Sequence, residues 1–342
     1  LGYIRLRSGQ DHYFIRGRQV IPSIRLRAIP LSQISLPEII SDPGLEDLGR
    51  LEASLQEVGL LNPPWLRPEA GGPGFQVVTG VRRLKAAARL GWQEISAHVV
   101  PEDTPDLFCL LVHLFDNAFS RGFNLREQAA LAVRLLEHGG RETVASGYLP
   151  YLGLPPSPAH LARLVKLAGL EEPWQRLAAQ GRLALTAGAR LAEWDPQDRA
   201  AAWSYFTGLR LSQSKQEEFL DQVDLLARRE GLSPKDVLAR EELHKVLDEG
   251  NHTPPEKTAA VRRLLYRWVY PRLSAAQADF ETALARLGWK RPARFRLHPP
   301  AAFEGPDYRL EINFRDAPEL KELLAEIARL ARLEEFGDLT NR

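Results

Sequence analysis

The apolar positions of the first hundred residues switch between two periods, which predicts a mixed α+β domain. After Asp42 they recur at helical spacing as far as Val58, and Gly59 follows as a stop signal. The run Phe75–Thr79 is rich in strand-forming residues, and the glycine-rich loop at 71–74 before it is typical of a hairpin. The remaining predicted elements are a strand entered through Pro63-Pro64-Trp65, a helix over Arg82–Leu90 and a strand over Glu94–Val100.

From Pro105 onward the pattern is helical. Pro105–Asn117 carries one apolar stripe, and Asn124 with Glu127 predicts a capping box for a helix over Leu125–His138. Residues 195–290 are predicted to be helical throughout. The predicted helices in that region are Asp195–Leu209, Lys215–Glu230, Ser233–Asp248 and Glu256–Tyr270.

The last of these helices interleaves basic and aromatic residues. They are Arg262, Arg263 and Arg267 beside Tyr266, Trp268 and Tyr270. Such a mixture can contact a nucleic-acid backbone. An amphipathic helix that buries its aromatic residues has the same pattern and is the commoner structure, so we expect the aromatic residues in the core.

The C-terminal pattern predicts two strands and a helix. The strands are Phe295–Leu297 and Tyr308–Phe314, and Asp316 and Glu319 cap the helix. Because so small a unit cannot bury its apolar face alone, we expect it to pair with a second copy as a homodimer. The residues predicted at that interface are Tyr308, Leu310, Ile312, Phe314, Leu320, Leu324 and Ile327.

Composition narrows the class of protein without identifying it. The 342 residues allow two or three domains, and 44% hydrophobic with 26% charged residues is ordinary for a globular protein. No apolar run approaches the ~20 residues of a membrane span and no signal peptide is visible, so we expect a cytoplasmic protein without a membrane partner. The single Cys109 argues against a disulfide framework and a Cys-based metal cluster.

Positive charge is local. The net charge is only +1, but residues 1–30 carry six arginines against one acid, Asp11. They indicate either a basic arm that touches DNA phosphates or the solvated face of short strands, and the sequence leaves both open.

The chemistry centres on the junction between Phe75–Thr79 and the helix that follows. Gly80 lets backbone amides approach a ligand, and Arg82 and Arg83 add charge beside the positive end of the helix dipole. This combination suits a polyphosphate. Taken alone, paired arginines at a helix start are more often a solvated face.

Asp116-Asn117, at the end of a predicted helix, adds oxygen donors. A carboxylate beside an amide oxygen can ligate a hard cation such as Mg²⁺. The same pair can also be a simple helix cap, and both interpretations stay open.

Three of these segments resemble, in order and separation, the nucleotide boxes of the ParB partition family. Gly59–Pro63 resembles the first box and Gly80–Ala87 the Gly-Glu-Arg-Arg box. Asp116-Asn117, with Arg121, Asn124 and Glu127 after it, resembles the Glu-Asn-x-x-Arg box. The resemblance implies CTP and Mg²⁺ as ligands and a dimeric clamp that nucleotide closes around DNA. The implied nucleotide-binding residues are Gly59, Asn62, Thr79, Gly80, Arg82, Arg83, Asn117 and Arg121, and the implied metal ligands are Asp116 and Asn117.

The resemblance continues downstream, apart from roughly residues 195–290. Leu152–Leu170 lies where the family has its helix-turn-helix, and DNA contact is expected from His160, Arg163 and Lys166. A solvated helix face is the alternative. The implied domains are an α+β ParB/sulfiredoxin-like domain over 1–122, a helix-turn-helix domain over 123–194, an all-α linker region over 195–290 and a ββα dimerisation domain over 291–342.

The chain departs from the family pattern at two of the boxes. Val81 stands where the family has Glu, and Asp116 is one methylene shorter than the family's Glu. We expect these changes to impair CTP hydrolysis more than they impair the binding of the phosphates. We therefore expect at most a weak CTPase, and no catalytic residue is assigned.

The sequence thus predicts a ParB-like, dimeric protein of the nucleoid that binds double-stranded DNA in chromosome partition, nucleoid organisation or related regulation, with a partition ATPase as a candidate partner. One alternative is a degenerate regulator or scaffold without nucleotide turnover. Another is a small-molecule kinase of the ParB/sulfiredoxin superfamily, which Val81 disfavours because it removes the carboxylate base. Sulfiredoxin chemistry would need a cysteine in the arginine box.

Overall fold

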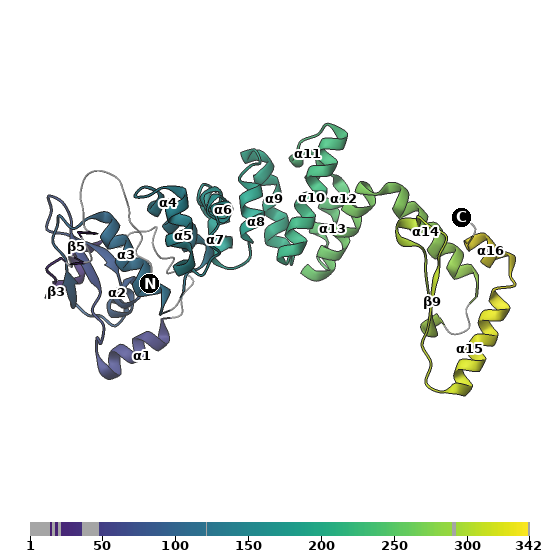
Figure 1. Cartoon of the computed structure of the whole chain (residues 1–342), viewed down its shortest axis with the longest axis horizontal. Helices are drawn as coiled ribbons and strands as arrows, with labels where there is room; N and C mark the ends of the chain where they lie inside the picture. The colour runs from purple at the N-terminus through teal and green to yellow at the C-terminus, as the bar shows by residue number, and fades with distance from the viewer. Residues whose placement is uncertain are drawn as a thin grey trace. The chain divides into compact units, whose positions relative to one another are not determined.

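The computed structural model describes residues 14–15, 18–19, 22–35, 48–120, 122–288 and 292–340 (Figure 1). By internal contacts the chain divides into two units. The first comprises residues 1–200 and 211–217, and the second comprises residues 201–210 and 218–342.

A five-stranded mixed sheet organises the N-terminal part of the first unit. Its strands lie in the order β3-β7-β5-β6-β4, with β7 antiparallel to β3 and parallel to β5. The hairpin of β5 and β6 confirms the prediction made from the glycine-rich loop. The bounds are β3 (Arg25–Pro30), β4 (Ile34–Ser35), β5 (Trp65–Pro68), β6 (Phe75–Thr79) and β7 (Glu94–Val99), after a short pair β1 (Phe14–Ile15) and β2 (Arg18–Gln19).

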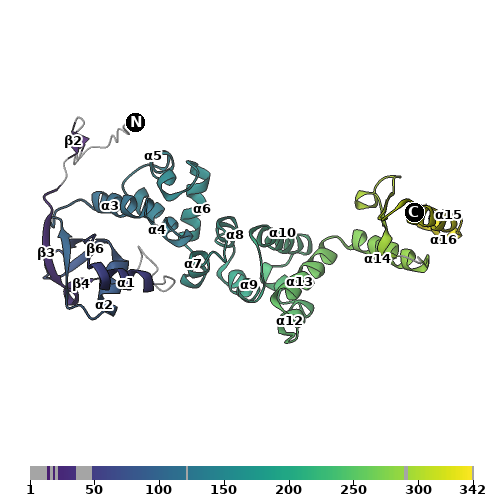
Figure 2. The ribbon, with the colours of Figure 1, turned by 90° about the horizontal axis from the view of Figure 1, so that it is seen from below.

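Helices cover this sheet because its strands alternate. In β7, Ile95, Ala97 and Val99 are buried while Glu94 and Ser96 are exposed. The core they share with β5 and β6 is closed by residues of α2, and α1 packs on α2 (Figure 2). The elements here are η1 (Leu31–Gln33), α1 (Gly49–Val58), α2 (Val81–Arg89) and α3 (Asp106–Ala118). The predicted start of the first helix lies outside the described residues.

The rest of the first unit is helical. The predicted capping box is confirmed, because Asn124 and Glu127 exchange side-chain-to-backbone hydrogen bonds at the start of α4. α4 packs against both α6 and α7. The bounds are α4 (Leu125–Leu136), α5 (Arg141–Gly147), η3 (Leu149–Leu152), α6 (Pro158–Ala168), α7 (Glu172–Ala179) and α8 (Leu185–Leu191).

The helices predicted for residues 195–290 follow, and apart from the first residues of α9 and α10 they belong to the second unit. One prediction is wrong: Ser233–Asp248 forms two helices rather than one. The break falls at Arg240, whose backbone is extended (ψ 134°). Its guanidinium pairs with Glu230 and lies 4.7 Å from the ring centroid of Trp268. The bounds are α9 (Pro196–Gly208), α10 (Gln213–Glu230), α11 (Pro234–Leu238), α12 (Glu241–Asp248), α13 (Pro254–Val269) and α14 (Pro271–Arg286).

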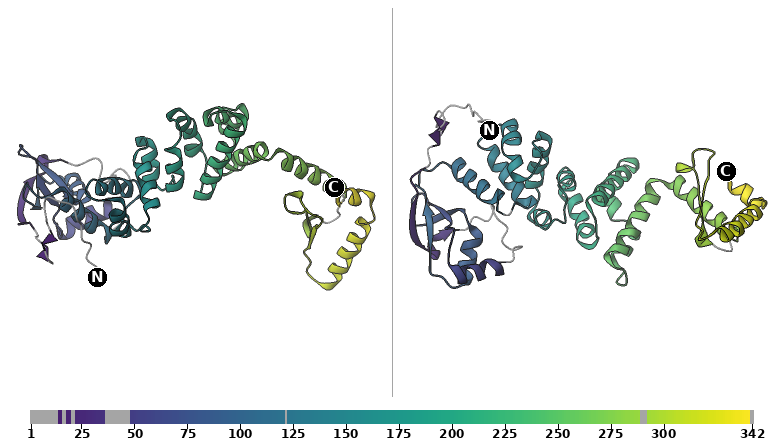
Figure 3. Two further views of the ribbon diagram at one scale, coloured as in Figure 1. Left: turned by 45° about the horizontal axis from the view of Figure 1, so that its top comes forward. Right: turned by 60° about the horizontal axis from the view of Figure 1, so that its bottom comes forward.

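The C-terminal part is the predicted strand pair and helix, with one addition. Its antiparallel strands pair Phe295 with Ile312 and Leu297 with Leu310. α14 contributes Phe280 and Leu287 to the core of this part of the chain. The green-to-yellow end of the ribbon in Figure 3 is this C-terminal part. The bounds are η4 (Pro292–Arg294), β8 (Phe295–His298), η5 (Ala301–Phe303), β9 (Arg309–Ile312), α15 (Ala317–Leu330) and α16 (Glu334–Thr340).

Because of α14, the residues predicted at a dimer interface do not share one environment. Tyr308 and Leu310 pack into the internal core with α14. Phe314 and Leu324 are exposed, at 51% and 49%. The other three residues of the set, Ile312, Leu320 and Ile327, are half-buried, as Tyr308 and Leu310 are.

Within the described part of the chain, no helix is both long enough and apolar enough to span a membrane.

We predict that Gly80→Ala destabilises the N-terminal sheet more than Gly91→Ala does. Both glycines have positive φ, at +98° and +76°, so either change strains the backbone by about 1–2 kcal/mol. A Cβ on Gly80 would also lie 2.7 Å from Pro64 Cβ, whereas one on Gly91 meets nothing within 4 Å. The added overlap costs about 1–3 kcal/mol. Amide hydrogen exchange of β5 and β6 measures the difference, and equal losses would contradict it.

Candidate nucleotide-binding site

The site begins where β6 turns into α2. β6 ends at Thr79, which is buried, and Gly80 then adopts the left-handed conformation that glycine tolerates. Because glycine has no side chain, α2 starts without a side-chain cap. Its first backbone N–H groups are the donors that a helix N-terminus offers to an anion.

The charges in the first turn of α2 run against the helix dipole. This turn contains Arg82 and Arg83 and no acidic residue. A cation at a helix N-terminus is unfavourable by about 0.3–1 kcal/mol. Such a local conflict is characteristic of a functional site, where the missing negative charge comes from a ligand.

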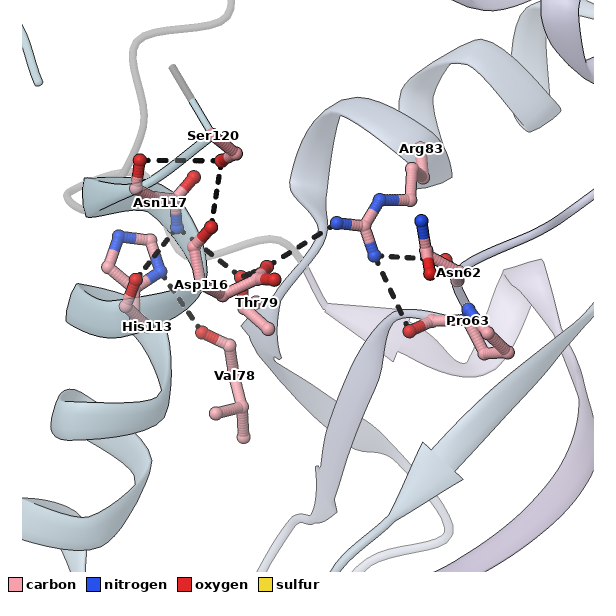
Figure 4. Close-up of polar contacts among 9 residues, drawn as sticks. All are labelled: Asn62, Pro63, Val78, Thr79, Arg83, His113, Asp116, Asn117 and Ser120. Carbon is pink, nitrogen blue, oxygen red and sulfur yellow. Dashed lines mark hydrogen bonds and ion pairs between the residues drawn. The ribbon is translucent and has the colours of Figure 1, made fainter. Parts of the chain in front are cut away.

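Arg83 joins the three segments that the sequence singled out (Figure 4). Its Nη1 donates to the carbonyl oxygens of Asn62, at 2.9 Å, and Pro63, at 3.4 Å. Its Nη2 lies 3.4 Å from Asp116 Oδ2. The guanidinium therefore bridges the loop before β5 and the end of α3.

The end of α3 is held to β6 by a second set of contacts (Figure 4). Thr79 Oγ1 donates to Asp116 Oδ2 at 2.7 Å and lies 3.4 Å from Asn117 Nδ2. The same Asn117 amide donates to the His113 carbonyl at 2.8 Å. Buried Thr79 thus connects the strand to both residues of the proposed metal pair.

Val81 does not face this site. Its side chain is 6% exposed and belongs to the core between α2 and the sheet. The departure from the family's Glu therefore changes a core position in this chain. No acid or base can reach the phosphate side of α2 from it.

The structure brings together most of the predicted nucleotide residues. Arg82 lies half-buried in the first turn of α2. Gly59 ends α1 with φ +72°, and its backbone N–H donates back to the Leu55 carbonyl of α1 rather than to the network. Arg121 lies outside the described residues. The contacts of the network join Asn62, Thr79, Arg83, Asp116 and Asn117, and Gly80 lies in the chain between Thr79 and α2.

Sequence reasoning missed His113. It is buried, and its ring Nδ1 lies 3.2 Å from the Val78 carbonyl, so Nδ1 carries the proton and donates. Its position four residues before Asn117, on the same helix face, was the available signal.

Asp116 and Asn117 offer few metal ligands by themselves. Among the described residues, no group of three or more His, Cys, Asp or Glu side chains could hold a metal ion. One carboxylate beside one amide fits Mg²⁺, which takes many of its ligands from phosphates and water. The donor set therefore fits a metal that arrives with a nucleotide.

The three predicted DNA-binding residues of α6 differ in environment. Burial, and after it the charge of Arg163, lower the pKa of His160, which is half-buried. Lys166 is exposed and paired with Glu193. Arg163 is exposed and has no ion pair with another described residue. Of the three, Arg163 offers the most available positive charge.

The start of α3 is fixed to the sheet by Arg67 of β5. Arg67 Nη1 donates to the Thr104 carbonyl at 2.9 Å and to Asp106 Oδ1 at 2.5 Å, and Nη2 donates to Gln76 at 3.2 Å. The hydrogen bond from Arg67 holds the pKa of Asp106 below its ordinary value. α3 is thus attached to the sheet at both ends.

The fold and the junction define an α+β domain with a glycine-initiated, uncapped strand-to-helix turn. Residues 18–117 match the family model of the ParB N-terminal domain. This stretch of the chain is therefore a ParB N-terminal domain. It is 36% identical over 123 residues to the chromosome-partitioning protein Spo0J of Thermus thermophilus, an alignment that covers 32% of this chain and 44% of the relative. The chain spans less than half the length, 44–45%, of the curated relatives it matches.

Solved structures are similar at lower identity. The C-terminally truncated ParB of Caulobacter crescentus in complex with CTP-gamma-S is 23% identical, with 54% of this chain and 99% of that chain covered and a TM-score of 0.25. The same protein complexed to the centromeric parS site is 23% identical, with 56% and 96% covered and a TM-score of 0.31. The family assignment depends on the sequence match, because superpositions at these TM-scores add nothing to it.

We predict that Asp106→Asn lowers the stability of the N-terminal domain slightly at pH 7 and not in acid. The Asp106 side chain is 56% exposed, so its pair with Arg67 contributes at most about 1 kcal/mol. Because folding lowers the Asp106 pKa, this contribution is present above the unfolded pKa and is lost as the pH falls through the folded one. Urea unfolding of both proteins at neutral pH and below the folded pKa tests this. A gap that persists in acid would contradict it.

Proposed function

We propose that this chain is a DNA-binding partition protein whose N-terminal domain binds CTP with Mg²⁺ and thereby controls its hold on double-stranded DNA. The observation that carries the proposal is the pair of arginines at the uncapped start of α2, joined by Arg83 to Asn62 and Asp116. CTP is chosen over other nucleotides by the family resemblance of the three boxes. The setting is chromosome partition, nucleoid organisation or related regulation.

The proposed binding mode follows from the charges. The triphosphate lies at the start of α2, against its backbone N–H groups and the guanidinium groups of Arg82 and Arg83. Mg²⁺ bridges the phosphates to Asp116 and Asn117. The exposed Asn62 loop is then the surface nearest to the ribose and base.

Nucleotide would replace an internal ion pair in this mode. Arg83 Nη2 and Asp116 Oδ2 are 3.4 Å apart, and the Asp116 side chain is 38% exposed. A phosphate is a stronger, multidentate partner for Arg83, and a divalent cation is a stronger partner for Asp116. Binding therefore replaces the weak pair of Arg83 and Asp116 by two stronger contacts, one of Arg83 with phosphate and one of Asp116 with the cation. The contacts that hold the end of α3 change as a result.

A physical route connects the site to the predicted DNA-binding helix. The end of α3 leads to α4, α3 packs on α4, and α4 packs on α6. A change in the contacts of Asp116 can shift the population of α3 positions, and with it those of α4 and α6. In this proposal α6 contacts DNA through Arg163, with His160 and Lys166 beside it.

Turnover is not required for this role. Val81 is a core residue, so the position that carries Glu in the family supplies no base here. We propose slow CTP hydrolysis or none. A degenerate regulator or scaffold differs from this proposal in binding no nucleotide, and a small-molecule kinase differs in needing a base at the site.

The C-terminal unit is proposed as the dimerisation domain. Phe314, two residues after β9, and Leu324 of α15 are exposed apolar residues, flanked by half-buried Ile312, Leu320 and Ile327. A second copy of the same unit is the partner that buries them. Tyr308 and Leu310 support that surface from the inner core. A partition ATPase is a further expected partner, with no surface assigned to it.

We predict that the chain binds CTP in the presence of Mg²⁺ and that Arg82→Ala abolishes the binding. The expected cause is the loss of one of two charge-assisted contacts to the phosphates. Isothermal titration with CTP, GTP, ATP and UTP, each with and without Mg²⁺, measures it. Sedimentation of the variant should still show a dimer, because the proposed dimer surface is elsewhere in the chain.

Arg89→Ala is the matched control. It removes the same charge from the other end of α2, where Arg89 is 60% exposed and, among the residues that the structure describes, pairs with Glu52 at 3.2 Å. It should leave CTP binding unchanged. No heat with any nucleotide would overturn the proposal, and unchanged CTP binding by Arg82→Ala would show that the pocket lies elsewhere.

A further inference from the structure

We infer that the outer face of α13 is a second DNA-contact surface, one that holds the phosphate backbone of a duplex. It lies in the region that the family resemblance does not cover. The inference rests on the proposed function only for its ligand, DNA, and its residues are separate from the nucleotide site and from α6.

The face is defined by residues at helical spacing that point away from the core. Val261, Leu265 and Val269 are buried on the inner side of α13. Arg263, Tyr266 and Arg267 are exposed on α13, and so is Tyr270, which directly follows its last residue; they stand at i, i+3, i+4 and i+7. We call these four residues the α13 stripe. The expectation that the aromatic residues would be buried is wrong for the two tyrosines, which are 37% and 45% exposed.

The arginines of α13 divide into two kinds. Arg262 is half-buried and pairs with α10, because its Nε and Nη2 donate to Glu218 at 2.8 to 3.2 Å. In the described part of the chain, Arg263 and Arg267 form no ion pair. Arg262 thus has a structural role, because it holds α13 to α10 through Glu218. Arg263 and Arg267 have no such acidic partner and present their two positive charges to solvent.

Capping of the helix does not account for Arg267. A cation in the last turn commonly interacts with the carbonyls at the helix C-terminus. In α13 this role is taken by Arg229 of α10, whose Nη1 donates to the Val269 carbonyl at 2.9 Å and whose Nη2 donates to the Trp268 carbonyl at 2.7 Å. Arg267 is therefore available to a ligand.

The surroundings of the stripe are also basic. At the C-terminal end of α13, Arg229 and Arg240 share one acid, Glu230, and exposed Arg272 follows at the start of α14. Within α13 itself, the acid on the stripe side is Glu256, which lies near the other end and accepts hydrogen bonds from Thr253. The C-terminal half of this helix carries arginines and no acid of its own, although the whole chain is nearly neutral.

The positive charge of the α13 stripe and its length along the helix both fit the phosphate backbone of duplex DNA. From Arg263 to Tyr270 the stripe rises by about 10 Å, at about 1.5 Å per residue. A DNA strand presents a phosphate every ~3.4 Å along the helix axis, so the stripe meets several phosphates at once. The tyrosine rings pack together, with centroids 5.0 Å apart, which holds their hydroxyl groups as further donors at one edge of the stripe.

The test compares three double variants of the full chain on a short random-sequence duplex, by fluorescence anisotropy over a range of salt concentrations. Arg263→Ala/Arg267→Ala alters the stripe, and His160→Ala/Arg163→Ala alters α6. Arg50→Ala/Arg332→Ala removes the same charge from exposed positions outside both surfaces. The stripe variant should weaken binding and reduce the slope of log K against log salt by about 2, because two phosphate contacts are lost. The control variant should match the wild type.

The possible results test DNA contact by the stripe and DNA contact by α6 independently. If the stripe variant behaves like the control while the α6 variant loses affinity, the stripe inference is wrong and the proposed function stands. If the stripe variant loses affinity and the α6 variant does not, the stripe stands and the role of α6 fails. A loss confined to single-stranded oligonucleotides would overturn the assignment to duplex DNA. An unchanged circular dichroism melting curve shows that the stripe variant is folded.

Discussion

Two positive charges at the positive end of a helix are the constraint on which the N-terminal domain depends. Arg82 and Arg83 open α2 where the dipole favours an acid, and no acid is present in that turn. The structure compensates part of this charge by drawing the Asn62 carbonyl and the Asp116 carboxylate to Arg83. Three segments that are distant in sequence converge on the junction for this reason. A ligand that carries several negative charges would complete the compensation, which is why the same feature that strains the fold also indicates its function.

Much of this arrangement is predictable because the signals are local. The period-2 and helical patterns define the strands and helices of the first domain, and the capping residues Asn124 and Asp316 form the predicted hydrogen bonds. The convergence of the boxes follows less directly. Phe75–Thr79 and the helix after it are adjacent in sequence, but the contact of Thr79 with Asp116 depends on α3 packing on β6, which no local pattern specifies.

Where the structure differs from the predictions made from the sequence, the cause is a tertiary contact. The pair of Arg240 with Glu230 and its contact with Trp268 stabilise an extended residue inside what reads as one continuous helix. α14 covers one side of the C-terminal strands, so Tyr308 and Leu310 serve a core within one chain as well as supporting an outer surface. In α13, the aliphatic residues at 261, 265 and 269 already fill the inner face, which leaves the tyrosines outside. Hydrophobic character alone does not say which of two apolar sets a helix buries.

The central claim is that a nucleotide at the start of α2 controls the hold on DNA. The most direct measurement is the lifetime of the complex between the full chain and duplex DNA of genomic origin, followed by electrophoretic shift and by dissociation after a salt jump, with and without CTP and Mg²⁺. The account predicts that CTP with Mg²⁺ changes this lifetime for the wild type and leaves it unchanged when Arg83 is replaced by alanine. Identical lifetimes of the wild-type complex with and without CTP would contradict it.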